Sequence, residues 1–129
     1  MKSIGKDGKL KTIILEDDFF LKTILEMMCK QHPDILCLGA FDDVGPALKF
    51  MEQASVDLVL LDVQLRSSNG YELLKHLPVE TRVVVVSSNP AAEKPEWPIP
   101  VTAFLSKPVR KEQFLQLIVD IKQQMDKLG

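Results

Sequence analysis

The chain has 129 residues, of which 46% are hydrophobic and 26% charged, and a formal net charge of −2. This length and composition are typical of one globular domain that is large enough to bury a core. The charge provides no basic surface for nucleic acid, and no apolar run approaches the about 18 residues of a membrane span. We therefore expect neither direct nucleic-acid binding nor a membrane segment.

The first residues, 1–10, are mostly polar and contain lysine and glycine. They lack the apolar centre of a secretion signal, so we expect a flexible leader and then one domain at 11–129, located in the cytoplasm. The two cysteines, Cys29 and Cys37, show neither metal-ligand spacing nor partners. Two reduced, buried thiols are therefore expected, as is usual in cytoplasmic proteins.

Strand and helix patterns alternate along the first half of the chain. Short apolar or β-branched runs predict strands, and apolar residues at helical spacing predict helices. In chain order these are a strand at 11–15, a helix at about 18–31, a strand at 35–41 and a helix that starts near residue 44. Pro33 ends the first helix, and Asp42 or Asp43 is expected to cap the second, with Pro46 in its first turn.

The most informative stretch runs from Asp57 to Val63. Its four consecutive apolar residues, Leu58–Leu61, predict a strand buried on both faces, as in a parallel sheet covered by helices. Asp62 then lies at the carboxyl end of that strand, on the edge where open α/β sheets bind their ligands. A carboxylate in this position is a ligand, a nucleophile or a structural cap.

The second half continues the alternation around one irregular segment. After Gly70, which allows a positive φ, we expect a helix at 71–77, strands at 82–86 and 101–105, and an amphipathic helix through 114–128. Four prolines lie among the twelve residues Asn89–Pro100, and a full helix cannot run through that spacing. The predicted α/β fold is a five-stranded parallel sheet with helices on both faces.

Polar side chains follow four of the predicted strands, in the order Glu16 and Asp17, Asp62, Ser87 and Ser88, and Lys107. Because the carboxyl ends of parallel strands share one edge, we expect these side chains to lie together. Grouped carboxylates bind a hard cation such as Mg²⁺, lysine and hydroxyl groups bind phosphoryl oxygens, and aspartate can form an aspartyl phosphate. Taken singly, each residue also fits a helix cap, a turn or a solvated loop.

These residues belong to motifs that resemble those of the receiver domain of two-component response regulators, in the CheY-like superfamily. The motifs are Ile14–Asp18, Asp57–Asp62, Asn69-Gly70, Val86–Ser88 and Phe104–Pro108. The resemblance covers nearly the whole chain after the leader. It implies a flavodoxin-like sheet of order 2-1-3-4-5 and a role in phosphorelay signal transduction.

The resemblance also implies a role for each residue of the acidic group. Asp62 corresponds to the phospho-acceptor of the family. Glu16 and Asp17 correspond to the acidic pair that binds Mg²⁺, Asp17 directly and Glu16 through water. Gln64 corresponds to the residue whose backbone carbonyl is a further metal ligand, and Asp18 has no implied role beyond capping the next helix.

The remaining motif residues concern the phosphoryl group and the switch. Ser87 corresponds to the hydroxyl that bonds the phosphoryl group, and Lys107 to the lysine that pairs with it. Pro108 follows through the cis peptide usual in the family, and Phe104 occupies the position of an aromatic residue that rotates inward when the hydroxyl moves. Phosphorylation adds a charge of about −1.5 to −2 at neutral pH, which biases a two-state element.

Three features depart from the family pattern. Arg66 stands where the family usually has proline. Asp62 and Ser87 are 25 positions apart, which is somewhat short for the family, so we expect a shortened third helix. The prolines of Asn89–Pro100 predict an irregular or missing fourth helix. That helix is part of the face usually used for output and dimerisation, so homodimerisation and the downstream partner stay open.

The resemblance implies Mg²⁺-dependent transfer of a phosphoryl group to Asp62 from a histidine kinase or a histidine phosphotransfer protein. Such a protein is at most self-phosphorylating from a phosphodonor and autodephosphorylating, and is not a conventional enzyme. The alternative is a pseudo-receiver, which binds protein partners without phosphorylation. A third hypothesis is a phosphatase or flavin protein on the same fold. The sequence shows neither the glycine-rich phosphate loop nor the catalytic triad that would favour it.

Overall fold

The structure is a computed structural model that describes residues 8–62, 70–88 and 102–128. Its elements follow the chain in the order β1 (Leu10–Leu15), α1 (Phe19–Gln31), β2 (Ile35–Phe41), α2 (Val44–Met51), β3 (Leu58–Leu61), α3 (Tyr71–Leu74), β4 (Arg82–Ser87), β5 (Ala103–Ser106) and α4 (Lys111–Leu128). Within these ranges, no helix combines the length and the apolar character that crossing a membrane requires.

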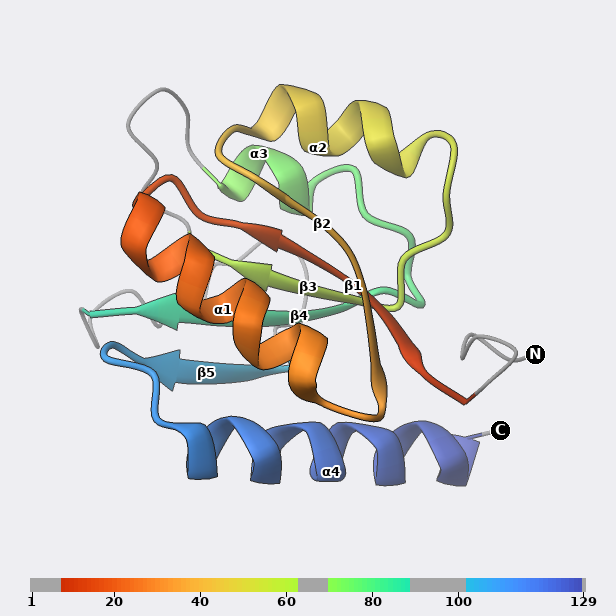
Figure 1. Ribbon diagram of the computed structural model, residues 1–129. Coiled ribbons are helices and arrows are strands. Elements are labelled where there is room, and N and C mark those ends of the chain that lie inside the picture. The colour runs from red at the N-terminus through yellow and green to blue at the C-terminus, as the bar shows by residue number, and fades with distance from the viewer. Residues whose placement is uncertain (1–7, 63–69, 89–101, 129) are drawn as a thin grey trace.

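The five strands form one parallel sheet in the order β2-β1-β3-β4-β5, which confirms the predicted topology (Figure 1). Helices α1 and α4 cover one face of the sheet, and α2 and α3 cover the other. Strand β3 lies in the middle with all four residues buried, which explains its apolar sequence without alternation. The strand order reverses between β1 and β3, so their carboxyl ends form a topological switch point.

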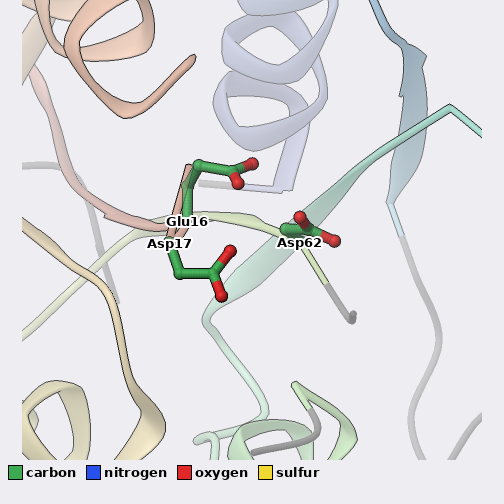
Figure 2. Close-up of side chains that lie close together, drawn as sticks. All are labelled: Glu16, Asp17 and Asp62. Atoms are coloured by element: carbon green, nitrogen blue, oxygen red, sulfur yellow. The ribbon is translucent and has the colours of Figure 1, made fainter. Parts of the chain in front are cut away.

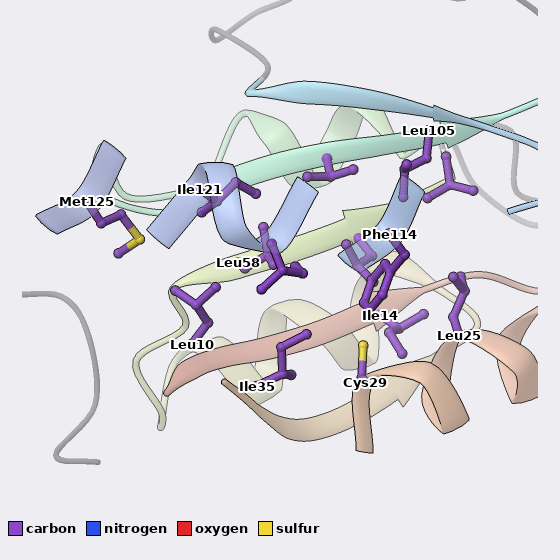
Figure 3. Close-up of a cluster of buried hydrophobic side chains, with 14 residues drawn as sticks. Leu10, Ile14, Leu25, Cys29, Ile35, Leu58, Leu105, Phe114, Ile121 and Met125 are labelled. Atoms are coloured by element: carbon purple, nitrogen blue, oxygen red, sulfur yellow. The ribbon is translucent and has the colours of Figure 1, made fainter. Parts of the chain in front are cut away.

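A hydrophobic core lies on each face of the sheet. The core beneath α1 and α4 contains Leu25, Phe114 and Ile118, packed on the apolar side chains of the sheet (Figure 3). The core beneath α2 and α3 contains Ala47 and Leu73. Each large apolar side chain that is fully buried contributes about 1.5–3 kcal/mol, so these two layers hold the strand ends in place.

A β-bulge interrupts the pairing of β2 with β1. Thr12 pairs with Cys37 but Ile13 pairs with Gly39, so Leu38 is an extra residue on β2. Cys37 packs against the core beneath α1, whereas Leu38 packs against the core on the opposite face. Cys29 is buried as expected, but Cys37 is only half-buried and the two thiols hydrogen-bond to each other. Both cysteines are free, as predicted, but the predicted burial is wrong for Cys37, because sequence spacing does not show how far a residue on an edge strand is covered.

Side chains cap the helices where the sequence predicts caps. Asp18 accepts a hydrogen bond from the backbone N–H of Leu21 at 3.3 Å, which begins α1. Asp43, rather than Asp42, is the residue before α2, and its carboxylate accepts from Val44 N–H at 2.7 Å. At the other end of α1, the His32 N–H donates to Cys29 O at 3.2 Å before Pro33 leaves the helix.

Several predicted boundaries differ from the structure. Helix α3 ends at Leu74 instead of Leu77, because the N–H groups of His76 and Leu77 bond to carbonyls three residues back and tighten the chain into a turn. Gly70 precedes this helix with φ −58°, so it does not adopt the positive φ that glycine allows. Strand β1 begins one residue earlier than predicted, β4 extends through Ser87, and β5 begins at Ala103.

Four predictions fall wholly or mostly outside the described residues. They concern the flexible leader at 1–10, Gln64, Arg66 and the irregular or missing fourth helix at Asn89–Pro100. These stay predictions, and the described part of the chain contains four helices.

Candidate functional site

The sheet itself positions the polar residues that follow its strands. The backbone N–H of Glu16 donates to Phe41 O at 2.9 Å, and that of Asp62 donates to Leu15 O at 2.9 Å. The N–H of Lys107 donates to Ser87 O at 3.0 Å. Each bond continues the parallel ladder one residue beyond a strand. The positions of these residues are therefore set by β-sheet register rather than by loop conformation.

Three carboxylates converge at the switch point. Glu16, Asp17 and Asp62 each offer an oxygen atom, and these atoms all lie within 4.8 Å of one another. Figure 2 shows the side chains of Glu16 and Asp17, which follow β1, beside that of Asp62, which follows β3. Glu16 is 1% exposed and Asp62 7% exposed, so two of the three charges are largely removed from solvent. Like charges this close repel one another unless a cation is near.

Lys107 follows β5, two strands away from β3, and supplies positive charge to this group at the same edge of the sheet. Its Nζ donates to Asp62 Oδ2 at 3.0 Å and lies 3.4 Å from Glu16 Oε1. One ammonium beside three carboxylates leaves two negative charges uncompensated among these four side chains. The residues that follow β1, β3 and β5 thus form one electrostatic unit, as the sequence predicts.

The pKa values of two of these groups reflect the crowding. Burial raises the pKa of Glu16, and the nearby charge of Asp62 adds to the rise, against the lowering effects of the Asp18 N–H and of Lys107. Burial alone would lower the pKa of Lys107, but its hydrogen bond to Asp62 and the charges of Asp62 and Glu16 raise it overall. Lys107 is therefore held in its charged form, while ionisation of Glu16 is less favourable than it would be in water.

The donor set fits a hard divalent cation. Glu16 Oε1 is buried and accepts no hydrogen bond from the described residues, although the Lys107 ammonium is near. Mg²⁺ prefers carboxylate oxygens and binds through one or two of them while keeping several waters. Glu16, Asp17 and Asp62 provide such oxygens, and a divalent cation would balance the two remaining charges.

Two further motif residues lie on the neighbouring strands. Ser87 is the last residue of β4, and its carbonyl bonds to Lys107 N–H. Phe104 on β5 is 38% exposed and lines an open hollow of about 320 Å³ between β5 and α4, together with Gln116, Leu117 and other residues. The Lys107–Pro108 peptide is cis, which confirms that expectation.

An apolar surface on α1 was not identified from the sequence. Phe19 and Phe20 are 76% and 79% exposed, and Ile24 and Met27 continue the exposed side of the helix. Ile24 has the helical spacing of Leu21, Leu25 and Met28, yet it is 43% exposed. Two consecutive phenylalanines directly after the acids were the available signal in the sequence.

Comparison with known proteins supports the fold and the family. The family model of the response regulator receiver domain matches residues 12–119. The transcriptional regulatory protein CitT of Halalkalibacterium halodurans is 30% identical over 126 residues, which cover 92% of this chain and 55% of CitT. The transcriptional regulatory protein YpdB of Escherichia coli K12 is 34% identical over 68 residues, which cover 53% of this chain and 28% of YpdB.

Solved structures show the same fold. The response regulatory domain of protein MrkE from Klebsiella pneumoniae superposes with a TM-score of 0.78 at 23% identity, covering 92% of this chain and 99% of that domain. A CheY-like receiver domain from Methylobacillus flagellatus gives a TM-score of 0.75 at 20% identity, covering 88% and 98%.

The matched portions set the scope of these comparisons. The chain spans 55% of the length of CitT and 28% of that of YpdB, so the activities of those whole proteins do not transfer to it directly. The family match, in contrast, extends over residues 12–119 and includes all five strands of the sheet except the first two residues of β1. The chain belongs to the family of response regulator receiver domains of two-component signalling systems.

Proposed function

We propose that this receiver accepts a phosphoryl group on Asp62 from a histidine kinase or a histidine phosphotransfer protein, and that the modification alters an interaction surface. The observation that carries the proposal is the contact of Asp62 with Lys107 at 3.0 Å within the group formed with Glu16 and Asp17. Receiver domains generally bind Mg²⁺ at an acidic pocket and form an aspartyl phosphate, and this group has the corresponding composition.

In the proposed reaction an oxygen of Asp62 attacks the phosphorus atom of the donor, and the bond from phosphorus to the donor's leaving group breaks. Phosphoryl transfer depends chiefly on positioning and on charge stabilisation. Asp62 is held by its backbone bond to Leu15, and Lys107 is placed to neutralise a phosphoryl oxygen. Burial at 7% exposure limits access of competing water to the carboxylate.

Glu16, Asp17 and Asp62 are proposed to hold Mg²⁺, with Gln64 as a further ligand through its backbone carbonyl. When bound, the ion neutralises negative charge that the carboxylates and the phosphoryl oxygens share. Glu16 contributes a buried, largely dehydrated charge, and Asp18 N–H fixes its side chain by donating to Oε2 at 3.0 Å. This arrangement orients one carboxylate oxygen of Glu16 toward Lys107 and Asp62.

The proposed output proceeds through Ser87 and Phe104. A phosphoryl group on Asp62 adds a charge of about −1.5 to −2 and strong acceptor oxygens beside β4. Ser87 ends β4, where its hydroxyl is proposed to bond one of these oxygens. Phe104 lies at the open hollow against α4, so an inward rotation of its ring would change the shape of that surface.

The proposed donor docks beside the acidic group. Phe19, Phe20, Ile24 and Met27 form an exposed apolar surface on α1, which begins two residues after Asp17. Exposed apolar patches next to a site are typical of protein-binding surfaces. A protein donor that covers this surface would present its phosphoryl group at the edge of the sheet that carries Asp62.

The proposal is tested by incubating the protein with Mg²⁺ and acetyl phosphate and measuring its intact mass. The control is Asp62→Asn, which removes the nucleophile and keeps the shape. We expect the unmodified protein to gain one phosphoryl group and the variant to gain none. Equal gain in both would contradict Asp62 as the acceptor. No gain together with no Mg²⁺ binding, measured by calorimetry, would favour the pseudo-receiver.

A further inference from the structure

The two cysteines of the chain meet between α1 and β2. Cys29 lies in the last turns of α1, Cys37 lies in β2, and the two side chains are hydrogen-bonded to each other. The chain reverses between them through the turn at His32, where Asp34 N–H donates to His32 Nδ1 at 3.0 Å. The sulfur atoms are held together by the packing of a helix on an edge strand, not by a mobile loop.

The surroundings of the two thiols differ. Cys29 is fully buried within the core beneath α1 and α4 (Figure 3). Cys37 is half-buried and packs against the edge of the same core. Because β2 is the edge strand of the sheet, a small molecule in solvent reaches Cys37 before it reaches Cys29.

The hydrogen bond with Cys29 is the largest influence on the pKa of Cys37 and lowers it to about 7, although burial opposes this change. The N–H of Gly39 lowers the pKa of Cys37 slightly further. The same hydrogen bond, together with burial, raises the pKa of Cys29. Lys30 lowers and Glu26 raises the pKa of Cys37, and these two residues lie 3.9 Å apart as an ion pair.

We propose that Cys29 and Cys37 form a reversible oxidation site, at which a hydroperoxide converts the two thiols into a disulfide that joins α1 to β2. The hydrogen bond between the two side chains makes their sulfur atoms neighbours, and a disulfide requires them to approach to about 2.05 Å. A half-buried sulfur beside a fully buried one is the arrangement of a reactive cysteine with a resolving partner.

The reaction proceeds in two balanced steps. The Cys37 thiolate attacks one peroxide oxygen, the O–O bond breaks, and a Cys37 sulfenic acid and hydroxide (or alkoxide) form. The Cys29 sulfur then attacks the Cys37 sulfur, the S–O bond breaks, and the released hydroxide takes the Cys29 proton as water. Overall the two thiols lose two electrons and two protons, and the hydroperoxide is reduced. A dithiol reductant reverses the change by thiol–disulfide exchange.

This proposal is independent of phosphorylation and is tested on the folded protein alone. The reduced protein is treated with one equivalent of hydrogen peroxide, alkylated and digested with trypsin. Trypsin cleaves after Lys30, between the two cysteines, so the disulfide would join peptides 23–30 and 31–49. We expect this linked pair, a loss of two hydrogen atoms from the intact monomer and complete reversal by dithiothreitol.

Two serine variants identify the order of events. In Cys29→Ser, oxidation should stop at a sulfenic acid on Cys37, which dimedone traps. In Cys37→Ser, the buried thiol of Cys29 should react with peroxide at least tenfold more slowly than Cys37 reacts in the unmodified protein. Circular dichroism verifies that each variant is folded, and the linked-peptide result on the unmodified protein does not depend on them. Oxygen addition without linked peptides, or linkage only between two chains on a non-reducing gel, would overturn the proposal.

Discussion

At the scale of single residues, Lys107 is the cation that contacts two carboxylates of the acidic group. Its ammonium contacts Asp62 at 3.0 Å and Glu16 at 3.4 Å, and Glu16 is 1% exposed. Removing one member of a buried charge group costs more than the pair contributes, because the remaining charges stay desolvated. The carboxylates therefore depend on Lys107 for charge compensation, and the surrounding sheet holds the group in place.

Replacing Lys107 should consequently reduce stability without Mg²⁺. We expect Lys107→Gln to lower the free energy of unfolding by about 1–3 kcal/mol, because it leaves buried carboxylates without their cation. Urea unfolding in the presence of a chelator measures this. The matched control is Lys122→Gln, which breaks a 3.5 Å pair with the 44% exposed Asp34 and should change stability by about 0–1 kcal/mol. Equal effects of the two variants would contradict the assigned role of Lys107.

A second residue-scale prediction concerns cation binding. On the proposed function, Mg²⁺ binds the folded chain and not the unfolded one, so adding it should raise the melting temperature. By mass action the gain in stability is about 2.7 kcal/mol when Mg²⁺ is present at 100 times its dissociation constant. Asp17→Asn should abolish most of that rise. Asp42→Asn removes the same charge from an exposed side chain that pairs with Lys22 at 3.9 Å, and should leave the rise intact. Thermal melts with and without Mg²⁺ make the comparison.

At the scale of elements, α1 connects the acidic group to the cysteine pair. It begins with the Asp18 cap and ends at His32, whose Nδ1 accepts from Asp34 N–H at 3.0 Å. The His32 ring also contacts the Phe114 ring edge-on at 6.2 Å between centroids, so the end of α1 packs on α4. A neutral imidazole is needed for this bond, because a protonated ring has no acceptor.

The end of α1 should therefore weaken in mild acid. Burial, aided by Lys122 and opposed by Asp34, lowers the pKa of His32 below 6.5 in the folded state. The unfolded state then binds more protons than the folded state. The contribution of His32 to stability is therefore fully present above pH 6.5 and is lost as the pH falls through the lowered pKa. His32→Asn retains an acceptor for Asp34 but does not titrate. As the pH is lowered from about 7.5 to about 5, we expect the urea midpoint of the unmodified protein to fall below that of His32→Asn.

At the scale of the whole molecule, two cores on opposite faces of one sheet hold the strand ends in register. The C-terminal helix α4 closes one of them through Phe114, Ile118 and Ile121, all at most 1% exposed. Because the ladder bonds of Glu16, Asp62 and Lys107 depend on this register, packing far from the acids determines the geometry of the acidic group.

Replacing a buried side chain of α4 with alanine should test that dependence. Phe114→Ala should lower the free energy of unfolding by about 3–5 kcal/mol, since it leaves a cavity where α4 meets the sheet. Its neighbour Leu115 is 38% exposed, and Leu115→Ala should cost much less. Chemical denaturation compares the two. A small effect of Phe114→Ala would show that α4 contributes little to the domain's stability.

The sequence by itself determined the order and type of the elements and the residues that follow the strands. Leu58–Leu61 is apolar without alternation because β3 is buried on both faces. This pattern lies within four consecutive residues and can therefore be recognised in the sequence. The convergence of Glu16, Asp62 and Lys107 followed from one rule, that parallel strands share a carboxyl edge. Helix caps such as Asp18 were predictable for the same reason, since they act within one turn.

Only the tertiary structure decided which side chains meet across elements. The extra residue Leu38 shifts the register of β2, and no periodicity in the sequence marks that shift. As a result the sequence did not show that Cys37 meets Cys29, or that Ile24 and the phenylalanines of α1 face solvent. Hydrophobic periodicity shows which residues share a face of a helix. The neighbouring strands and helices determine which face is covered.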